Sequence, residues 1–293
     1  WNLSRHAYLT EATSAAGRGR AIALFGGTTR LGVFAGPVLG GLLAAQFGLR
    51  APFLLTALLG ALTALLAVRF TESAPRAGSA GTQAGGSLRS VALEHAGVLG
   101  TAGLGQLLAQ AIRAARSVVL PLYGASVIGL PVEAVGLLMS LASLVDMAMF
   151  YPAGLVMDRW GRKHAIVPSF VLQGLGMMLV PTTGSFLGLL LAAALIGFGN
   201  GLGSGSMMTL GADLAPRASL GAFLGLWRLV GDGGAMAGPL LVGFVAQALA
   251  LPVAALAMGG VGLLAAAVFA FGVPETLRRS AEPTGPPGAS PGG

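Results

Sequence analysis

The chain has 293 residues, of which 55% are hydrophobic and only 9% are charged. Soluble domains carry about a quarter charged residues, so this composition excludes a water-exposed globular surface and predicts an all-α protein that crosses the lipid bilayer. The net charge of +7 comes from arginines scattered singly between apolar runs, which excludes a nucleic-acid-binding surface, and the absence of cysteine excludes disulfides and thiolate metal sites.

Apolar runs of about 20 residues predict eight transmembrane helices, separated by proline, glycine and charged residues. We expect them at residues 19–46, 50–70, 95–124, 131–157, 164–182, 185–211, 218–248 and 251–273. The chain opens on Trp1 without a signal peptide, and residues 1–10 are expected to be the end of one more helix. A stretch rich in glycine and serine, 71–93, predicts a linker between an N-terminal block, 1–70, and a six-helix block, 94–275, and residues 276–293 predict a disordered tail.

The basic residues of the loops are distributed unevenly between the two sides of the membrane. They gather in the loops that follow an even number of crossings, with Arg50 alone on the opposite side. Because basic loops stay in the cytoplasm, this asymmetry predicts a multi-pass protein of the plasma membrane whose linker and C-terminus are cytoplasmic.

An internal repeat appears when the sequence is shifted by 202 residues against itself. The shift superposes Gly36-Pro37 on Gly238-Pro239 and brings Thr71-Glu72 close to Pro274-Glu275-Thr276. A repeat in the same direction predicts two halves related by an axis along the membrane normal, with the binding site between the halves.

Two motifs resemble signatures of the major facilitator superfamily. The first resembles the G-x-x-x-D-R-x-G-R-K cytoplasmic loop of the family and contains Gly154, Asp158, Arg159, Gly161, Arg162 and Lys163. The second resembles the fifth-helix motif of drug and metabolite antiporters and contains Gly32, Gly36, Pro37, Gly40 and Gly41. The resemblance implies a major-facilitator-type bundle of two six-helix halves, from which this chain would lack the first three to four helices.

The first motif has two interpretations. By resemblance to the family it forms a cytoplasmic gate, in which Asp158 would cap the helix N-terminus at Gly19–Ala21, because a helix N-terminus favours an anion. Alternatively, the loop is only a basic membrane anchor and its aspartate is incidental.

Charged residues inside the spans are functional candidates, because charge in hydrocarbon is costly unless it faces a partner or a wet cavity. Arg30 and Asp146 lie at similar depths on helices that the family packs side by side, so they are expected to pair. The pair would either exchange a proton or substrate during transport or form a permanent bridge. Arg228 and Asp232 lie one helical turn apart and would either neutralise each other or take part in proton coupling. Arg116 is expected to extend to the outer headgroups.

Polar residues also recur along two spans. In the third span they fall on one helical face, which predicts a cavity wall with an arginine for an anionic or polar substrate, or else a row of structural hydrogen bonds. These residues are Gln106, Gln110, Arg113 and Ser117. Asn200 and Ser204 lie one turn apart in the sixth span, amid glycines that explain close helix packing as well as they explain substrate binding.

Together these features predict a monomeric secondary active transporter that works by alternating access and couples protons to the efflux of a small drug-like molecule or metabolite. The alternatives are a proton-coupled uptake symporter for a sugar or organic anion, and a transporter-like membrane sensor or scaffold that moves nothing. An enzyme is not expected, because the sequence offers no convergent nucleophile and base. No cofactor or metal is expected, because the three histidines lack ligand spacing. The chain by itself is expected not to transport.

Overall fold

The computed structural model describes residues 18–70 and 88–277, with side chains described for 28–69 and 88–277. Within these ranges the chain is helical and contains no β-strand, and eight of its helical segments are long and apolar enough to cross a membrane. The prediction of an all-α membrane protein with eight spans is confirmed. The expected helix end at 1–10, the linker residues 71–87 and the tail residues 278–293 lie outside the described residues.

The helices follow the predicted spans closely. The N-terminal block has α2 (Arg18–Phe47) and α3 (Arg50–Phe70). The larger block has α4 (Leu88–Glu94), α5 (Ala96–Tyr123), α6 (Val132–Arg159), α7 (Arg162–Leu179), α8 (Phe186–Leu202), α9 (Ser206–Leu214), α10 (Leu220–Ala248) and α11 (Leu251–Ala267). Short helical turns extend some of these ends: η1 (Gly124–Ile128), η2 (Val180–Thr182), η3 (Arg217–Ser219) and η4 (Val268–Gly272).

In the structure the sixth predicted span consists of two helices, α8 and α9. α8 ends at Leu202 and α9 begins at Ser206, and between them Gly205 has a φ of +76°, a left-handed conformation that favours glycine. The break interrupts the helical hydrogen bonds inside a membrane-spanning segment, where a backbone carbonyl that loses its helical partner needs another donor from the protein. The predicted span over 185–211 is confirmed as one membrane-spanning segment, Phe186–Leu214, in which this break separates α8 from α9.

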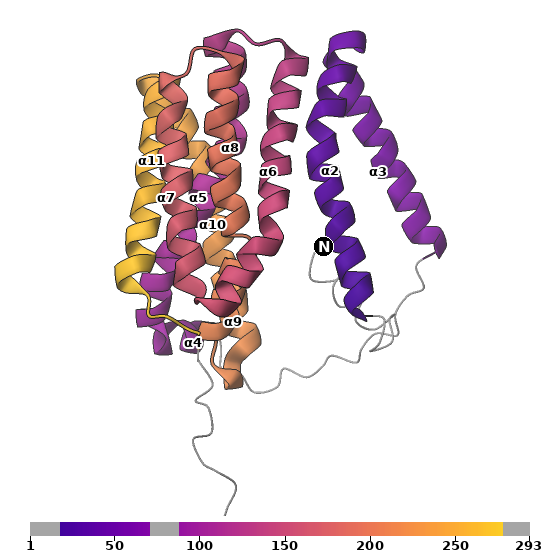
Figure 1. Cartoon of the computed structure of the whole chain (residues 1–293). Helices are drawn as coiled ribbons and strands as arrows, with labels where there is room; N and C mark the ends of the chain where they lie inside the picture. Colours follow the sequence, from indigo (N-terminus) through magenta and orange to yellow (C-terminus); the bar gives the residue numbers. More distant parts are fainter. Residues whose placement is uncertain (1–17, 71–87, 278–293) are drawn as a thin grey trace, which may run out of the picture.

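The larger block is a bundle, and α2 and α3 lie together beside α6 at one side of it (Figure 1). The turn between α6 and α7, helices α4 and α9, and the end of α3 lie at the same end of the molecule (Figure 1). We call this the basic end, because its described side chains include Arg69, Arg89, Arg159, Arg162, Lys163 and Arg217.

The bundle is held by glycines that let helix backbones touch. A side chain on Gly234 of α10 would collide with the backbone of Leu107 on α5, and one on Gly238 would collide with the backbone of Ala111. Helices in lipid gain little from the hydrophobic effect on meeting each other, so close van der Waals contact through small residues holds them together.

The contact between α2 and α6 uses part of the predicted packing motif. Gly41 lies against the Val132–Gly136 backbone, and a side chain on Gly136 would collide with the Pro37 carbonyl. The Val38 amide donates a hydrogen bond of 3.0 Å to Ser140 Oγ. At the remaining glycines of the motif, a Cβ atom would meet no described atom within 4 Å, so the packing of the described residues does not require glycine there: Gly32, Gly36 and Gly40.

Candidate functional site

A partly buried ion pair joins three helices near the middle of the bundle. Asp146 of α6 accepts hydrogen bonds through Oδ2 from Arg116 Nη2 of α5 at 3.1 Å and from Asn200 Nδ2 of α8 at 2.6 Å. The side chains of Arg116 and Asp146 are only 24% and 16% exposed. A carboxylate at this depth therefore has one cationic partner and one neutral partner.

The expected pair of Arg30 with Asp146 is replaced by another arrangement. Arg30 donates a hydrogen bond of 3.1 Å to Ser204 Oγ, and its guanidinium carbon lies 3.7 Å from the centre of the Phe150 ring. Counting residues along the helices gives depth but not rotation about the helix axis, and it is Arg116 of α5 that reaches the carboxylate. The expectation that Arg116 extends to the outer headgroups was wrong for the same reason.

Arg113 lies against the break between α8 and α9. Its Nη2 donates a 2.9 Å hydrogen bond to the Gly203 carbonyl, which also accepts from the amide and the hydroxyl of Ser206, and its guanidinium lies 5.1 Å from the centre of the Phe170 ring. Its Nε is buried and has no hydrogen-bond partner among the described residues. We call Arg30, Arg113, Arg116, Asp146, Asn200 and Ser204 the central cluster.

The polar residues predicted to share one face of α5 have different surroundings in the structure. Gln106 is buried and its Oε1 has no hydrogen-bond partner among the described residues, whereas Gln110 is half-buried. Ser117 is exposed and donates a hydrogen bond of 2.6 Å to the Ala114 carbonyl of its own helix. Only the first two of these side chains and Arg113 face other helices.

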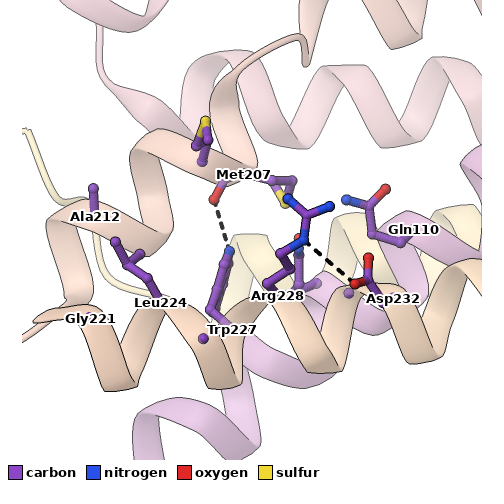
Figure 2. A pocket seen from close by; sticks show the side chains of 12 residues that line it. Gln110, Met207, Ala212, Gly221, Leu224, Trp227, Arg228 and Asp232 are labelled. Carbon is purple, nitrogen blue, oxygen red and sulfur yellow. Dashed lines mark hydrogen bonds and ion pairs between the residues drawn. The ribbon is translucent and has the colours of Figure 1, made fainter. Parts of the chain in front are cut away.

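A pocket of ≈ 500 Å³ lies between α5, α9 and α10 (Figure 2). Figure 2 shows Gln110 pointing toward Arg228 and Asp232, which form an ion pair of 3.5 Å within α10. The Trp227 indole forms one wall and donates a hydrogen bond of 3.0 Å to the Met207 carbonyl. The lining comes from α5, α9 and α10: Gln106, Gln110, Met207, Met208, Ala212, Gly221, Leu224, Gly225, Trp227, Arg228, Gly231 and Asp232.

The first motif forms a second polar network at the basic end. Arg162 Nε donates to Asp213 Oδ2 at 3.0 Å, and the same oxygen accepts from Thr276 Oγ1 at 2.9 Å. Asp158 is 79% exposed and lies 3.9 Å from Arg162, which is a weak contact. The expected partner of Asp158, the first turn of α2 at Gly19–Ala21, belongs to a stretch of which only the helical backbone is described.

Glu275 caps the N-terminus of α7. Its carboxylate accepts hydrogen bonds from the backbone amides of Arg162 at 2.9 Å and Lys163 at 3.0 Å, and from its own neighbour Leu277 at 2.9 Å. Partial burial raises the pKa of Glu275, but these backbone hydrogen bonds outweigh burial, so the pKa lies below its ordinary value. The cap links the start of α7 to the segment after α11.

The other motif residues support this cap in different ways. Gly161 has a φ of +113°, and a side chain there would collide with the Glu275 carboxylate. Lys163 Nζ donates a 2.6 Å hydrogen bond to the Ala270 carbonyl. Arg159 is exposed, and Gly154 has no described atom close enough to exclude a side chain. In the part of the chain that the structure describes, no group of His, Asp and Glu side chains is arranged to hold a metal ion.

The eight spans and the ion-paired centre between them define a polytopic helical membrane protein with a polar interior. The sequence profile of the Major Facilitator Superfamily matches residues 3–102 and 102–291. The chain therefore belongs to the major facilitator superfamily, a family of membrane transporters.

The chain is also similar to two MFS-type transporters of Mycobacterium tuberculosis, the uncharacterized Rv0849 of strain H37Rv and the putative uncharacterized MT0872 of strain CDC 1551. Each is 33% identical over 146 residues, which make up 50% of this chain and 34% of the relative. The match thus spans about a third of the length of these relatives.

Proposed function

We propose that the protein is a proton-coupled secondary active transporter that works by alternating access, and that it exports small amphipathic molecules from the cytoplasm. The site lies in the central cluster and the adjoining pocket, and Asp146 carries the proton. The basic end faces the cytoplasm of a plasma-membrane protein in this proposal, as its arginines and lysine favour.

The proposal of proton coupling rests on one observation: the same carboxylate oxygen of Asp146 accepts hydrogen bonds from the charged Arg116 and from the neutral Asn200. Protonation of Asp146 removes the charge that holds Arg116 but leaves an oxygen that still accepts from Asn200. The proton therefore changes the partners of Arg116 without removing the contact between α6 and α8. Such a switch needs a carboxylate that is buried yet paired with a group able to turn away.

Export is favoured by the resemblance of the α2 motif to antiporters. A second candidate, proton-coupled uptake of a sugar or organic anion, is favoured by the geometry of Arg116, because protonation of Asp146 frees this guanidinium for a substrate acceptor. In an antiporter the proton and substrate exclude each other, whereas in a symporter they bind together. The two candidates thus differ in the direction of the pH gradient that concentrates substrate.

The basic-end network is proposed to act as the gate on the cytoplasmic side. Glu275 and Asp213 hold the first turn of α7 through Arg162, and opening toward the cytoplasm would separate α7 from the segments that carry these two acids. The weakly held Asp158 is free to contact a neighbouring helix in that motion.

The test is flux into proteoliposomes that contain the full-length protein, with a permanently charged anion, naphthalenesulfonate, and a permanently charged cation, ethidium, as probes. We expect Asp146→Asn to abolish accumulation driven by a pH gradient while exchange of the probe without a gradient persists.

Glu133→Gln, an acid-to-amide change at the far end of α6, is the matched control and should leave both accumulation and exchange unchanged. Accumulation in vesicles with an acidic lumen supports export, and accumulation with an alkaline lumen supports uptake. Proton-driven accumulation by Asp146→Asn equal to that of the unaltered protein would refute the role of this carboxylate.

A further inference from the structure

The central cluster contains more guanidinium groups than carboxylates. Arg30 of α2 and Arg113 of α5 each donate to the segment from Asn200 to Ser204, and Arg116 of α5 reaches the same segment through Asp146, which accepts from Asn200. Asp146 is the one acid that any of the three arginines contacts among the described residues. Three positive charges against one negative charge leave an excess of two within the membrane-spanning part of the bundle.

The excess charges are held by neutral partners. Arg113 donates to the Gly203 carbonyl and lies over Phe170, while Arg30 donates to a serine hydroxyl and lies over Phe150. Carbonyl, hydroxyl and aromatic partners orient a guanidinium but do not cancel its charge. A cation without a counter-ion in this environment is costly, so such a site favours an anion.

The pocket supplies the complementary apolar surface. Gln110 lines it and lies three residues before Arg113 on α5, so the pocket adjoins the cluster within a turn of the helix. Met207, Leu224 and Trp227 give its walls an apolar and adaptable character. Arg228 and Asp232 form an ion pair with each other, so the pocket itself adds no net charge.

We propose that the substrate is an amphipathic organic anion, with its apolar body in the pocket and its anionic group directed to Arg113. The Arg113 Nε is buried and has no hydrogen-bond partner among the described residues, so it offers a donor to an oxygen of a carboxylate, sulfonate or phosphate group. This inference deepens the proposed transport function and names the class of its substrate.

The test is equilibrium binding to the purified full-length protein by isothermal titration calorimetry with three probes that share one apolar body. They are naphthalenesulfonate, the neutral isostere naphthalenesulfonamide, and the cation naphthylmethylammonium. We expect the sulfonate to bind most tightly, and Arg113→Gln to weaken its binding by about 10- to 100-fold while binding of the sulfonamide stays unchanged. Arg217→Gln removes a charge from the exposed turn at the basic end and is the matched control, which should keep the preference for the anion.

Equal binding of the three probes, preference for the cation, or binding of none would overturn the inference. A preference for the sulfonate that Arg217→Gln abolishes as strongly as Arg113→Gln would also overturn it, because net charge alone would then explain the preference. Anion preference without proton-driven flux would refute only the transport proposal, whereas proton-driven flux of ethidium without anion preference would refute only the substrate class.

Discussion

The pairing of Asp146 with Arg116 predicts a specific energetic coupling between two side chains of different helices. We propose two double-mutant cycles on the full-length protein, both built on Asp146→Asn. One cycle combines it with Arg116→Gln and the other with Arg30→Gln. Asp146→Asn keeps the size of the side chain and removes only its charge, whereas both arginine changes remove the charge and shorten the side chain equally, so the two cycles can be compared directly. The structure predicts strong coupling in the first cycle and weak coupling in the second.

The size of the first coupling follows from the distance and the burial of the pair. Two unit charges separated by 3.1 Å attract each other by about 5 kcal/mol at an effective dielectric constant of about 20. Desolvation offsets much of this attraction: exposed pairs contribute about 0.2–1 kcal/mol, whereas loss of one partner of a buried pair costs about 3–5 kcal/mol. Since Arg116 and Asp146 are 24% and 16% exposed, we expect a coupling of about 1–3 kcal/mol.

The coupling is measured as the free energy of unfolding of the purified protein in mixed-detergent titrations. For Arg30 we expect about 0.5 kcal/mol or less, because its hydrogen bond goes to Ser204. The result that would refute the reasoning is a coupling of Asp146 with Arg30 that equals or exceeds its coupling with Arg116.

Two further predictions concern stability. Gly259→Ala should lower the free energy of unfolding by about 1–3 kcal/mol, because the added methyl group would enter the contact with Gly174 of α7. Gly260→Ala is the control: its methyl group would face open space on the same helix, so the free energy of unfolding should stay within about 1 kcal/mol of that of the unaltered protein. Equal thermal unfolding midpoints of the two variants in detergent would contradict this prediction. Glu275→Gln should weaken the cap of α7 by about 1 kcal/mol at neutral pH. The pKa of Glu275 is lower in the folded protein than its ordinary value of 4.5, so the carboxylate stabilises the fold fully above pH 4.5 and loses this effect as the pH falls through the lowered pKa. The difference in the free energy of unfolding between the unaltered protein and Glu275→Gln should therefore shrink below pH 4.5. A difference that grows on acidification would contradict the cap.

The spans were predictable from the sequence because they follow from one physical requirement. Each crossing of the hydrocarbon layer requires about 20 apolar residues. The loops lie outside this layer, so they can contain the charged residues, prolines and glycines that show where the spans end. The fold class followed from the same rule and from motifs of the family. The repeat also marked Glu275, since the shift that superposes Gly36-Pro37 on Gly238-Pro239 brings two similar acidic segments together. The role of Glu275 as a helix cap required the structure.

The partners of the buried charges were not predictable, and the reason is geometric. Counting residues along a helix fixes depth to within a turn, but contact also depends on the rotation of each helix and on the reach of long side chains. Arg30 is at a suitable depth for Asp146, yet its guanidinium donates to Ser204, while the long Arg116 side chain reaches the carboxylate from α5. The break after Leu202 has a related cause, because a run of glycines fits close packing and a broken helix equally well.

The contacts between helices also indicate which parts of the molecule would have to separate in the proposed alternating-access cycle. Within the larger block, α5 and α10 meet backbone to backbone at Gly234 and Gly238, and α7 meets α11 in the same way at Gly259. Such contacts cannot slide without collisions, so the block would move as one body. The contact of α2 with α6 is of the same kind, because a side chain on Gly136 would collide with the Pro37 carbonyl, and the hydrogen bonds from Val38 to Ser140 and from Arg30 to Ser204 extend it. A rocking motion that separated α2 from the larger block would have to break these contacts, and the Arg30 hydrogen bond would link that motion to the central cluster.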